Sequence, residues 1–78
     1  MTELNLTEKT FYSIQEVSDL LDIKPYVLRY WETQFKLLRP ARRPSGQRKY
    51  TRKDIELIVR IRELLYDKGF TIAGAKKV

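Results

Sequence analysis

A three-residue interval, Asp22-Ile23-Lys24, separates two short helical patterns and limits how this chain can fold. Before it, Ser13 and Glu16 have the spacing of a capping box, in which each side chain bonds to the other's backbone N–H. A helix is therefore expected to begin after Ser13 and to run to about Leu21. After the interval, Pro25 suits a first helical position, because its φ is already helical and its missing N–H would have no partner there.

The interval itself has the composition of a tight turn between two helices. Asp22 is one of the few residue types other than glycine that tolerate a left-handed backbone, so it is expected to close the first helix. Ile23 is apolar, which suggests that it lies between the two helices. The first helix is expected to bury residues at helical spacing: Ile14, Val17, Leu20 and Leu21. Helix, turn and short second helix are the elements of a helix-turn-helix.

The second helix, Pro25–Glu32, has two unlike sides. Val27, Leu28 and Trp31 share one side at a spacing that favours burial. The other side carries, after Lys24, the side chains of Tyr26, Arg29 and Tyr30. Such a helix can pack on a core and present its polar side to nucleic acid. In the alternative interpretation, the two tyrosines are half-buried core aromatics and the arginine is simply solvated.

The net charge of +6 is concentrated in one segment. Residues 36–53 carry eight positive charges and no acidic residue, whereas the flanking residues 1–35 and 54–78 are close to neutral. Such a concentration of charge attracts a polyanion. A solvated basic loop is the alternative.

Two prolines within this basic segment exclude a continuous helix. Pro44-Ser45-Gly46 is a turn sequence between two basic arms, and Arg39–Tyr50 is therefore predicted to form a short β-hairpin, or wing. Leu37, Leu38 and Tyr50 are expected to pack inward while the arginines project outward. A proline in an arm implies an edge strand, so the hairpin should not extend a larger sheet.

A third helix is expected after Thr51, which is an N-cap residue with Asp54 in the capping-box position. Its apolar stripe is wide and comprises Ile55, Leu57, Ile58, Val59, Ile61, Leu64 and Leu65, with Arg62 on the same side. Lys68 and Gly69 have the composition of a helix end. Phe70 is expected to anchor in the core. Thr71 is a new N-cap, and Ile72, Ala75 and Val78 would begin a fourth helix, inside which the chain ends.

Composition excludes several other classes. At 78 residues the chain is expected to be one domain, or part of a longer protein, and its 42% hydrophobic content gives it enough apolar area to collapse. It has no cysteine and no histidine, so disulfides, thiolate metal sites and the commonest general base are absent. We therefore expect no enzyme activity, no metal and no cofactor. There is no secretory signal and no apolar run of membrane-spanning length, which favours a cytoplasmic protein with no membrane partner.

These motifs, taken in order, resemble the MerR-type (mercury-resistance-regulator-like) bacterial transcription regulators over about residues 12–78. The matching segments are Tyr12-Ser13-Ile14-Gln15-Glu16-Val17, Leu28-Arg29-Tyr30-Trp31-Glu32, Gly46-Gln47-Arg48-Lys49-Tyr50, Thr51-Arg52-Lys53-Asp54-Ile55 and Gly69-Phe70-Thr71-Ile72. The resemblance implies a mainly α winged helix-turn-helix with three to four helices and a short β-hairpin wing. Residues 1–11 would be a flexible lead and residues 12–78 the DNA-binding domain.

The resemblance also implies residue roles and partners. Arg29 looks like a base or phosphate contact, Tyr30 like a phosphate contact, and Arg48 like the wing arginine that holds the backbone. Members of this family bind promoter DNA at the bacterial nucleoid as homodimers and act on RNA polymerase indirectly by distorting the DNA. The dimerisation and effector regions would lie beyond Val78. The chain departs from the family pattern at Asp22, often glycine, at Lys24, often Ser or Thr, at Trp31, usually tyrosine, and at Gln47, often aromatic.

The sequence thus predicts sequence-specific binding of double-stranded DNA, with Pro25–Glu32 in the major groove and the wing on the phosphates. From the residues alone, Tyr26 and Arg29 are placed to reach base edges. The complete set of expected DNA contacts is Lys24, Tyr26, Arg29, Tyr30, Arg42, Arg43, Gln47, Arg48, Lys49 and Lys53. Two alternatives stay open: a protein-interaction module whose basic wing face binds an acidic partner, and an excisionase-like architectural DNA binder. RNA binding ranks lower, since nothing resembles a sheet of exposed aromatics.

Overall fold

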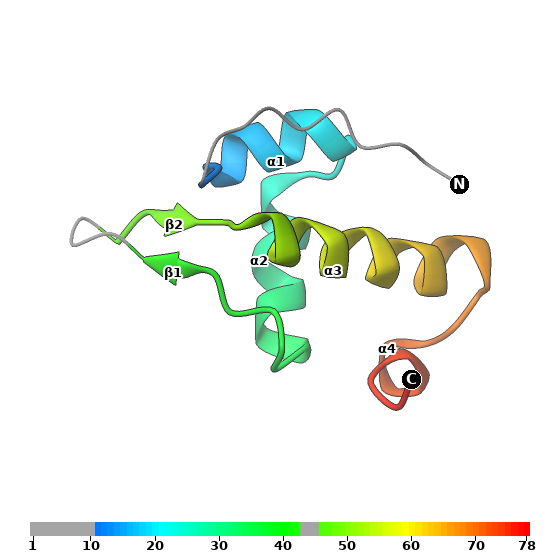
Figure 1. The fold of residues 1–78 in the computed structure, drawn as a ribbon. Coiled ribbons are helices and arrows are strands. Elements are labelled where there is room, and N and C mark those ends of the chain that lie inside the picture. Colours follow the sequence, from blue (N-terminus) through cyan, green and yellow to red (C-terminus); the bar gives the residue numbers. More distant parts are fainter. Residues whose placement is uncertain (1–10, 43–45) are drawn as a thin grey trace.

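The computed structural model describes residues 11–42 and 46–78. In these residues four α-helices pack beside one short hairpin, which projects away from the helices at the left of Figure 1. The elements are α1 (Ile14–Leu21), α2 (Pro25–Gln34), β1 (Ala41–Arg42), β2 (Arg48–Lys49), α3 (Arg52–Arg62) and α4 (Ile72–Ala75). This is the mainly helical fold with a short wing that the sequence predicts. Within the described ranges, each helix falls short of the length and apolar character that crossing a bilayer requires.

Two capping boxes begin α1 and α3, as predicted. In the first, the Glu16 N–H donates to Ser13 Oγ at 3.1 Å, and the Ser13 N–H donates to Glu16 Oε1 at 2.8 Å. In the second, the Asp54 N–H donates to Thr51 Oγ1 at 3.2 Å, and the Thr51 N–H donates to Asp54 Oδ2 at 2.9 Å. Both starts are local in sequence, which is why pattern alone located them.

The turn between α1 and α2 also forms as expected. Asp22 adopts a left-handed backbone, with φ 55° and ψ 47°, and its N–H donates to the carbonyl of Ser18. Ile23 is buried. From α3, the guanidinium of Arg62 donates to the carbonyl of Leu21, which satisfies an acceptor at the end of α1. The turn is thereby tied to α3 as well as to its own two helices.

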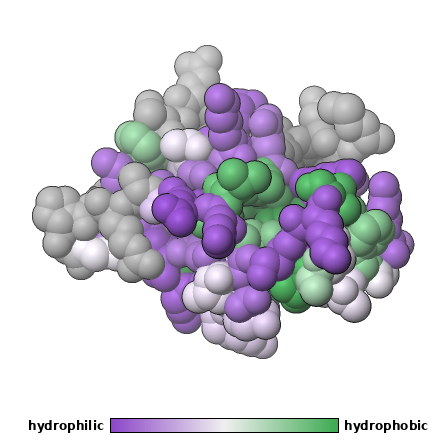
Figure 2. Space-filling view, turned by 90° about the horizontal axis from the view of Figure 1, so that it is seen from below, coloured by the Kyte–Doolittle hydropathy of each residue, from purple (hydrophilic) through white to green (hydrophobic). Residues whose placement is uncertain are grey.

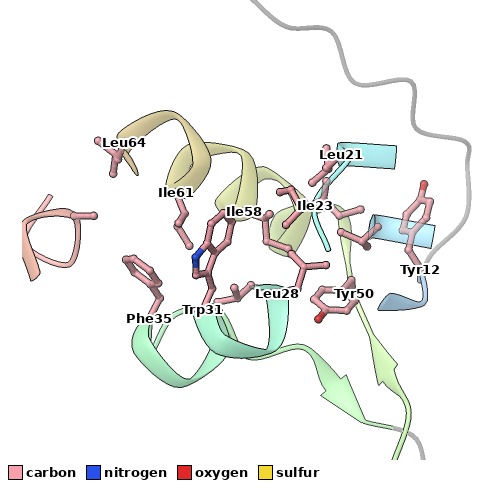
Figure 3. Close-up of a cluster of buried hydrophobic side chains, with 14 residues drawn as sticks. Tyr12, Leu21, Ile23, Leu28, Trp31, Phe35, Tyr50, Ile58, Ile61 and Leu64 are labelled. Atoms are coloured by element: carbon pink, nitrogen blue, oxygen red, sulfur yellow. The ribbon is translucent and has the colours of Figure 1, made fainter. Parts of the chain in front are cut away.

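The hydrophobic core lies between α2 and α3 (Figure 3). Leu28 and Trp31 point from α2 toward Ile58 and Ile61 of α3, and Phe35 extends the cluster toward α4. The buried apolar residues are Tyr12, Val17, Leu21, Ile23, Leu28, Trp31, Phe35, Leu38, Tyr50, Ile55, Ile58, Ile61, Leu64 and Ala75. The apolar stripe predicted for the second helix is therefore confirmed at Leu28 and Trp31. The stripe predicted for the third helix is confirmed at Ile55, Ile58 and Ile61. Trp31 is core, as the sequence indicated.

Three expected core residues are exposed instead. The buried side of α1 is centred on Val17 and Leu21, so Leu20 lies at its edge. Leu37 is 84% exposed in the turn that follows α2, whereas its neighbour Leu38, whose N–H donates to the Phe35 carbonyl at 3.0 Å to close that turn, is buried. Phe70 is also exposed.

The carboxyl end of α3 is wound differently from the expected continuous helix. It passes into a π-helical turn, Glu63–Asp67, in which the Lys68 N–H donates to the Glu63 carbonyl at 3.0 Å. Gly69 follows with φ +70°, the left-handed conformation expected of a residue that ends a helix. Thr71 then caps α4 through a 3.0 Å bond from the Gly74 N–H. The glycine stop and the new cap are both confirmed.

The wing is short and is tied to the start of the domain. β1 and β2 pair antiparallel with Ala41 opposite Lys49 and Arg42 opposite Arg48. Beyond β2, Tyr12 and Tyr50 exchange two backbone hydrogen bonds of 2.8 Å. This bridge, which sequence pattern did not indicate, connects the segment before α1 to the end of the wing. The expected Pro44-Ser45-Gly46 turn falls largely outside the described residues.

Candidate nucleic-acid interface

The exposed side of α2 presents two tyrosines and an arginine. Tyr26 is 67% exposed and Tyr30 is 53% exposed, and Arg29 between them is also exposed. Because Leu28 and Trp31 are buried on the opposite side, the helix cannot turn this polar side inward. The interpretation of the tyrosines as core aromatics is therefore wrong.

Lys24 stands at the N-cap of α2 and is exposed. Its side chain makes no capping hydrogen bond, as the departure from Ser or Thr suggested. The amino end of a helix attracts anions through its unpaired N–H groups and its dipole, and a lysine there adds a full positive charge. This end of α2 is thus suited to a phosphate.

Arg48 on β2 turns toward α2 rather than outward, so that part of the expectation for the wing is wrong. Its Nε donates to both carboxylate oxygens of Glu32 at 2.8 Å. The Arg48 side chain retains 16% exposure and the Glu32 side chain 10%. The physical reason is that Glu32 is the one acidic residue of α2, and it lies within reach of the wing.

Tyr50 completes this network from the strand end. Its hydroxyl donates to Glu32 Oε2, and the side chain is fully buried. Burial, followed by the hydrogen bond to the Glu32 carboxylate, raises the pKa of Tyr50 well above its usual range. The phenol therefore remains a neutral donor in the folded chain. Through Arg48 and Tyr50, one carboxylate on α2 holds both the strand and the end of the wing.

A cleft of about 260 Å³ opens between α2 and the wing. Arg29, Arg39 and Arg48 line it together with Glu32 and Thr33. Three guanidinium groups against one carboxylate make the local charge positive, which favours an anionic ligand. The cleft brings together two of the expected DNA contacts, Arg29 and Arg48.

The remaining expected contacts are more dispersed. The Lys49 ammonium lies 4.4 Å from the centre of the Phe11 ring, a cation–π contact. Gln47 is exposed and lines a hollow against Ser13 and Gln15, at the start of α1. Lys53 is exposed on the first turn of α3.

Two wing arginines are only partly accounted for. The backbone of Arg42 pairs in β1, and its side chain falls outside the described residues. Arg43 lies entirely outside the described residues. In the ranges that are described, no group of three potential metal ligands comes together.

Sequence reasoning missed three residues at this interface. Glu32 stood out only as part of a motif, although a lone acid on a helix beside a basic segment is a signal for an ion pair. Arg39 contributed to the basic charge of its segment without any feature that distinguished it from the other cations. Phe11 belongs to the expected flexible lead, and nothing in its neighbourhood in the sequence indicated the contact with Lys49.

A helix-turn-helix whose second helix presents cations and tyrosines, followed by a basic two-stranded wing, defines the winged helix-turn-helix class. The comparison with solved structures agrees with this fold. A crystal structure of HiNmlR, a MerR family regulator lacking the sensor domain and bound to promoter DNA, matches with a TM-score of 0.72. That match is 22% identical and covers 86% of this chain and 52% of HiNmlR.

Sequence comparison then gives the family. The model for MerR HTH family regulatory proteins matches residues 12–78, and this chain belongs to that family. The transcriptional repressor CarH of Myxococcus xanthus is 32% identical over 73 residues, which cover 94% of this chain and 24% of CarH. The transcriptional regulator MlrA of Escherichia coli is 37% identical over 65 residues, covering 83% of this chain and 26% of MlrA. The chain thus spans about a quarter of the length of these curated relatives, which are regulators rather than enzymes.

Proposed function

We propose that this chain binds double-stranded DNA sequence-specifically for transcription regulation, with α2 in the major groove and the wing along the phosphate backbone. The observation that carries the proposal is the exposed row of Tyr26, Arg29 and Tyr30, beside a wing held to the same helix by Glu32 and Arg48. An α-helix fits the major groove, where arginine pairs with guanine in bidentate fashion. The likeness in fold to a MerR family regulator that is bound to promoter DNA supports the binding of DNA by this chain.

Within this proposal the side chains divide into two groups. Tyr26 and Arg29 read base edges, and Arg29 is the principal source of discrimination. The other contacts bind phosphates or position the wing: Lys24, Tyr30, Arg42, Arg43, Gln47, Arg48, Lys49 and Lys53. Phosphate contacts fix the orientation of the protein without reading sequence.

The regulator as a whole is proposed to act as a homodimer on a near-palindromic promoter site and to influence RNA polymerase indirectly. Two half-sites bound together give far higher affinity than one, because the second contact becomes intramolecular. This chain on its own is expected to bind one half-site weakly. The CarH and MlrA chains are about three to four times as long as this one, which leaves room in those two regulators for further regions of this kind.

The proposal is tested by selecting duplexes from a randomised pool with this chain and then titrating the enriched duplex into it, with amide chemical shifts as the readout. Shifts are expected along residues 24–32 and in β2, and they should weaken as salt is raised. The carboxyl end of α3 is the internal control, because it carries none of the proposed contacts. A pool without an enriched motif, or shifts confined to α3 and α4, would overturn the proposal.

A further inference from the structure

An apolar groove runs along the face formed by the end of α2, the middle of α3, and α4. It encloses about 440 Å³. Phe35, Leu57, Ile61 and Leu64 form its floor and walls. Figure 2, which looks onto the molecule from below, shows apolar surface gathered in a hollow between hydrophilic side chains.

The most exposed apolar side chain among the large ones of the described residues lies in this groove: Leu37 is 84% exposed. A leucine left in water forgoes the free energy that burial would supply. A contiguous apolar surface of this kind, edged by polar groups, marks an interaction site more often than a scattering of single residues does.

The edge of the groove is cationic. Lys36, Arg60 and Lys76 line it, all three are exposed, and no carboxylate side chain lines it. Among the described residues none of these three cations forms an ion pair. An occupant with carboxylates on either side of an apolar stripe would complement both the floor and the edge.

We propose that this groove binds an amphipathic, acidic α-helix of a partner protein. The apolar stripe of the helix would lie on Leu37, Leu57 and Ile61, and its carboxylates would pair with Lys36, Arg60 and Lys76. Helix-in-groove recognition of this kind uses apolar anchors at helical spacing. A small ligand fits less well, because such sites add a few converging polar groups that fix orientation, and this lining supplies only cations at the edge.

The apolar groove shares no residue with the proposed DNA interface. None of the residues lining it is among the ten expected DNA contacts, and the cleft beside Arg29 is lined by a separate set of residues. The chain can therefore hold a protein helix and a duplex at the same time. The proposal therefore differs from the alternative in which an acidic partner binds the basic wing face and competes there with DNA.

The test uses a synthetic amphipathic helix of about 14 residues, with leucine along one stripe and glutamate beside it. A second peptide has lysine in place of every glutamate. The acidic peptide is expected to bind, to shift amide signals of residues 34–37 and 57–64, and to bind more weakly as salt is raised. The basic peptide is expected not to bind. Equal binding of both peptides, or no binding of either, would overturn the proposal.

Matched variants test the residues. Leu37→Ser removes an exposed anchor without disturbing the core, and it should lower the affinity for the acidic peptide about tenfold or more. Leu20→Ser, on α1 outside the groove, is the control and should not. Lys76→Glu should weaken binding about fivefold, whereas Lys68→Glu, which does not line the groove, should have little effect.

Two further measurements distinguish a partner helix in the groove from DNA and from a second copy of this chain. Leu37→Ser is expected to leave duplex binding unchanged, so failure of the DNA proposal and failure of this one are distinguishable. Sedimentation of the unmodified chain at micromolar concentration tests self-association. A stable dimer that Leu37→Ser dissociates would show that a second copy covers the groove, and would overturn the proposed partner.

Discussion

Glu32 of α2 and Arg48 of β2 form an ion pair in which Arg48 Nε lies 2.8 Å from both carboxylate oxygens. The pair is mostly shielded from water, so it is screened less than a surface pair. It joins the helix proposed to read bases to the wing proposed to hold phosphates. The Nη nitrogens of the guanidinium carry its other four N–H donors. One arginine can therefore position the wing and still present donors to DNA.

Glu32→Gln is expected to lower the free energy of unfolding by about 2 kcal/mol, since it leaves the Arg48 charge without its partner. Chemical denaturation at neutral pH measures the loss. Glu56→Gln, at an exposed position on α3, is the matched control and should change stability by about 0.5 kcal/mol or less.

The coupling between the two residues is measured by a double-mutant cycle with Glu32→Gln and Arg48→Met. The sum of the stability losses of the two single variants should exceed the loss of the double variant by about 1–3 kcal/mol. Simple additivity would mean that the contact contributes nothing specific.

Tyr50 predicts a pH dependence of stability. Its pKa is raised in the folded chain by burial and by Glu32, whereas in the unfolded chain the phenol ionises near pH 10. Its contribution is therefore fully present below about pH 10 and is lost as pH rises further, at up to about 1.4 kcal/mol per pH unit. Denaturation between neutral and alkaline pH measures the slope.

Tyr50→Phe separates this effect from the other groups that titrate at high pH. The variant should lose about 1–2 kcal/mol at neutral pH, because Glu32 loses a donor, and its stability should fall less steeply above pH 10 than that of the parent chain. Tyr26→Phe, which removes an exposed hydroxyl, should match the parent chain at neutral pH. An alkaline slope for Tyr50→Phe as steep as the parent's would contradict the assignment.

Local signals in the sequence predicted local structure well. The capping box of Ser13, the left-handed Asp22 and the stop at Gly69 each depend on residues within one turn of the chain, and all three are confirmed. The family resemblance and the winged fold are confirmed as well.

What the sequence did not predict depends on contacts between distant residues. The Glu32–Arg48 pair spans sixteen positions, and the Tyr12–Tyr50 bridge spans more than thirty. Leu37 and Leu38 are equally apolar, so composition cannot tell which of them faces the core. For the same reason the sequence indicated basic side chains along the wing but not that Arg48 turns back to α2.

Asp22 predicts a test of the turn. Its φ of 55° is unfavourable for a side chain that is branched at Cβ, so Asp22→Val should lower the free energy of unfolding by about 1–2 kcal/mol. Asp22→Gly relieves the backbone and should be neutral or stabilising by up to about 1 kcal/mol. Thermal unfolding of the two variants measures the difference. Equal stability of the valine and glycine variants would exclude a left-handed turn in solution.

Arg29→Ala should reduce discrimination between the selected duplex and a scrambled one by about 1–3 kcal/mol, the value of one bidentate arginine–guanine contact. Arg29 is exposed and forms no hydrogen bond or ion pair with residues of the described ranges, so stability should be retained. Arg48→Ala should weaken binding to both duplexes alike. It should also lower the stability of the fold, because Glu32 loses the guanidinium to which it is bound. Equilibrium binding to both duplexes measures the effects. Equal losses of affinity for both variants on both duplexes would contradict the assignment of Arg29 to base recognition and of Arg48 to phosphate binding.

Lys24→Ser is expected to change stability and DNA affinity in opposite directions. The residue occupies an extended N-cap position without a side-chain capping bond, so serine can accept from the first turn of α2 and add about 0.5–1 kcal/mol of stability. The same change removes one cation from the proposed interface, which should lower the slope of log K against log salt by about 0.9. Lys68→Ser, just after the π-helical turn that follows α3, should leave that slope unchanged. A variant that gains stability while keeping the full salt slope would show that Lys24 contacts no phosphate, and the amino end of α2 would then lie away from the DNA backbone.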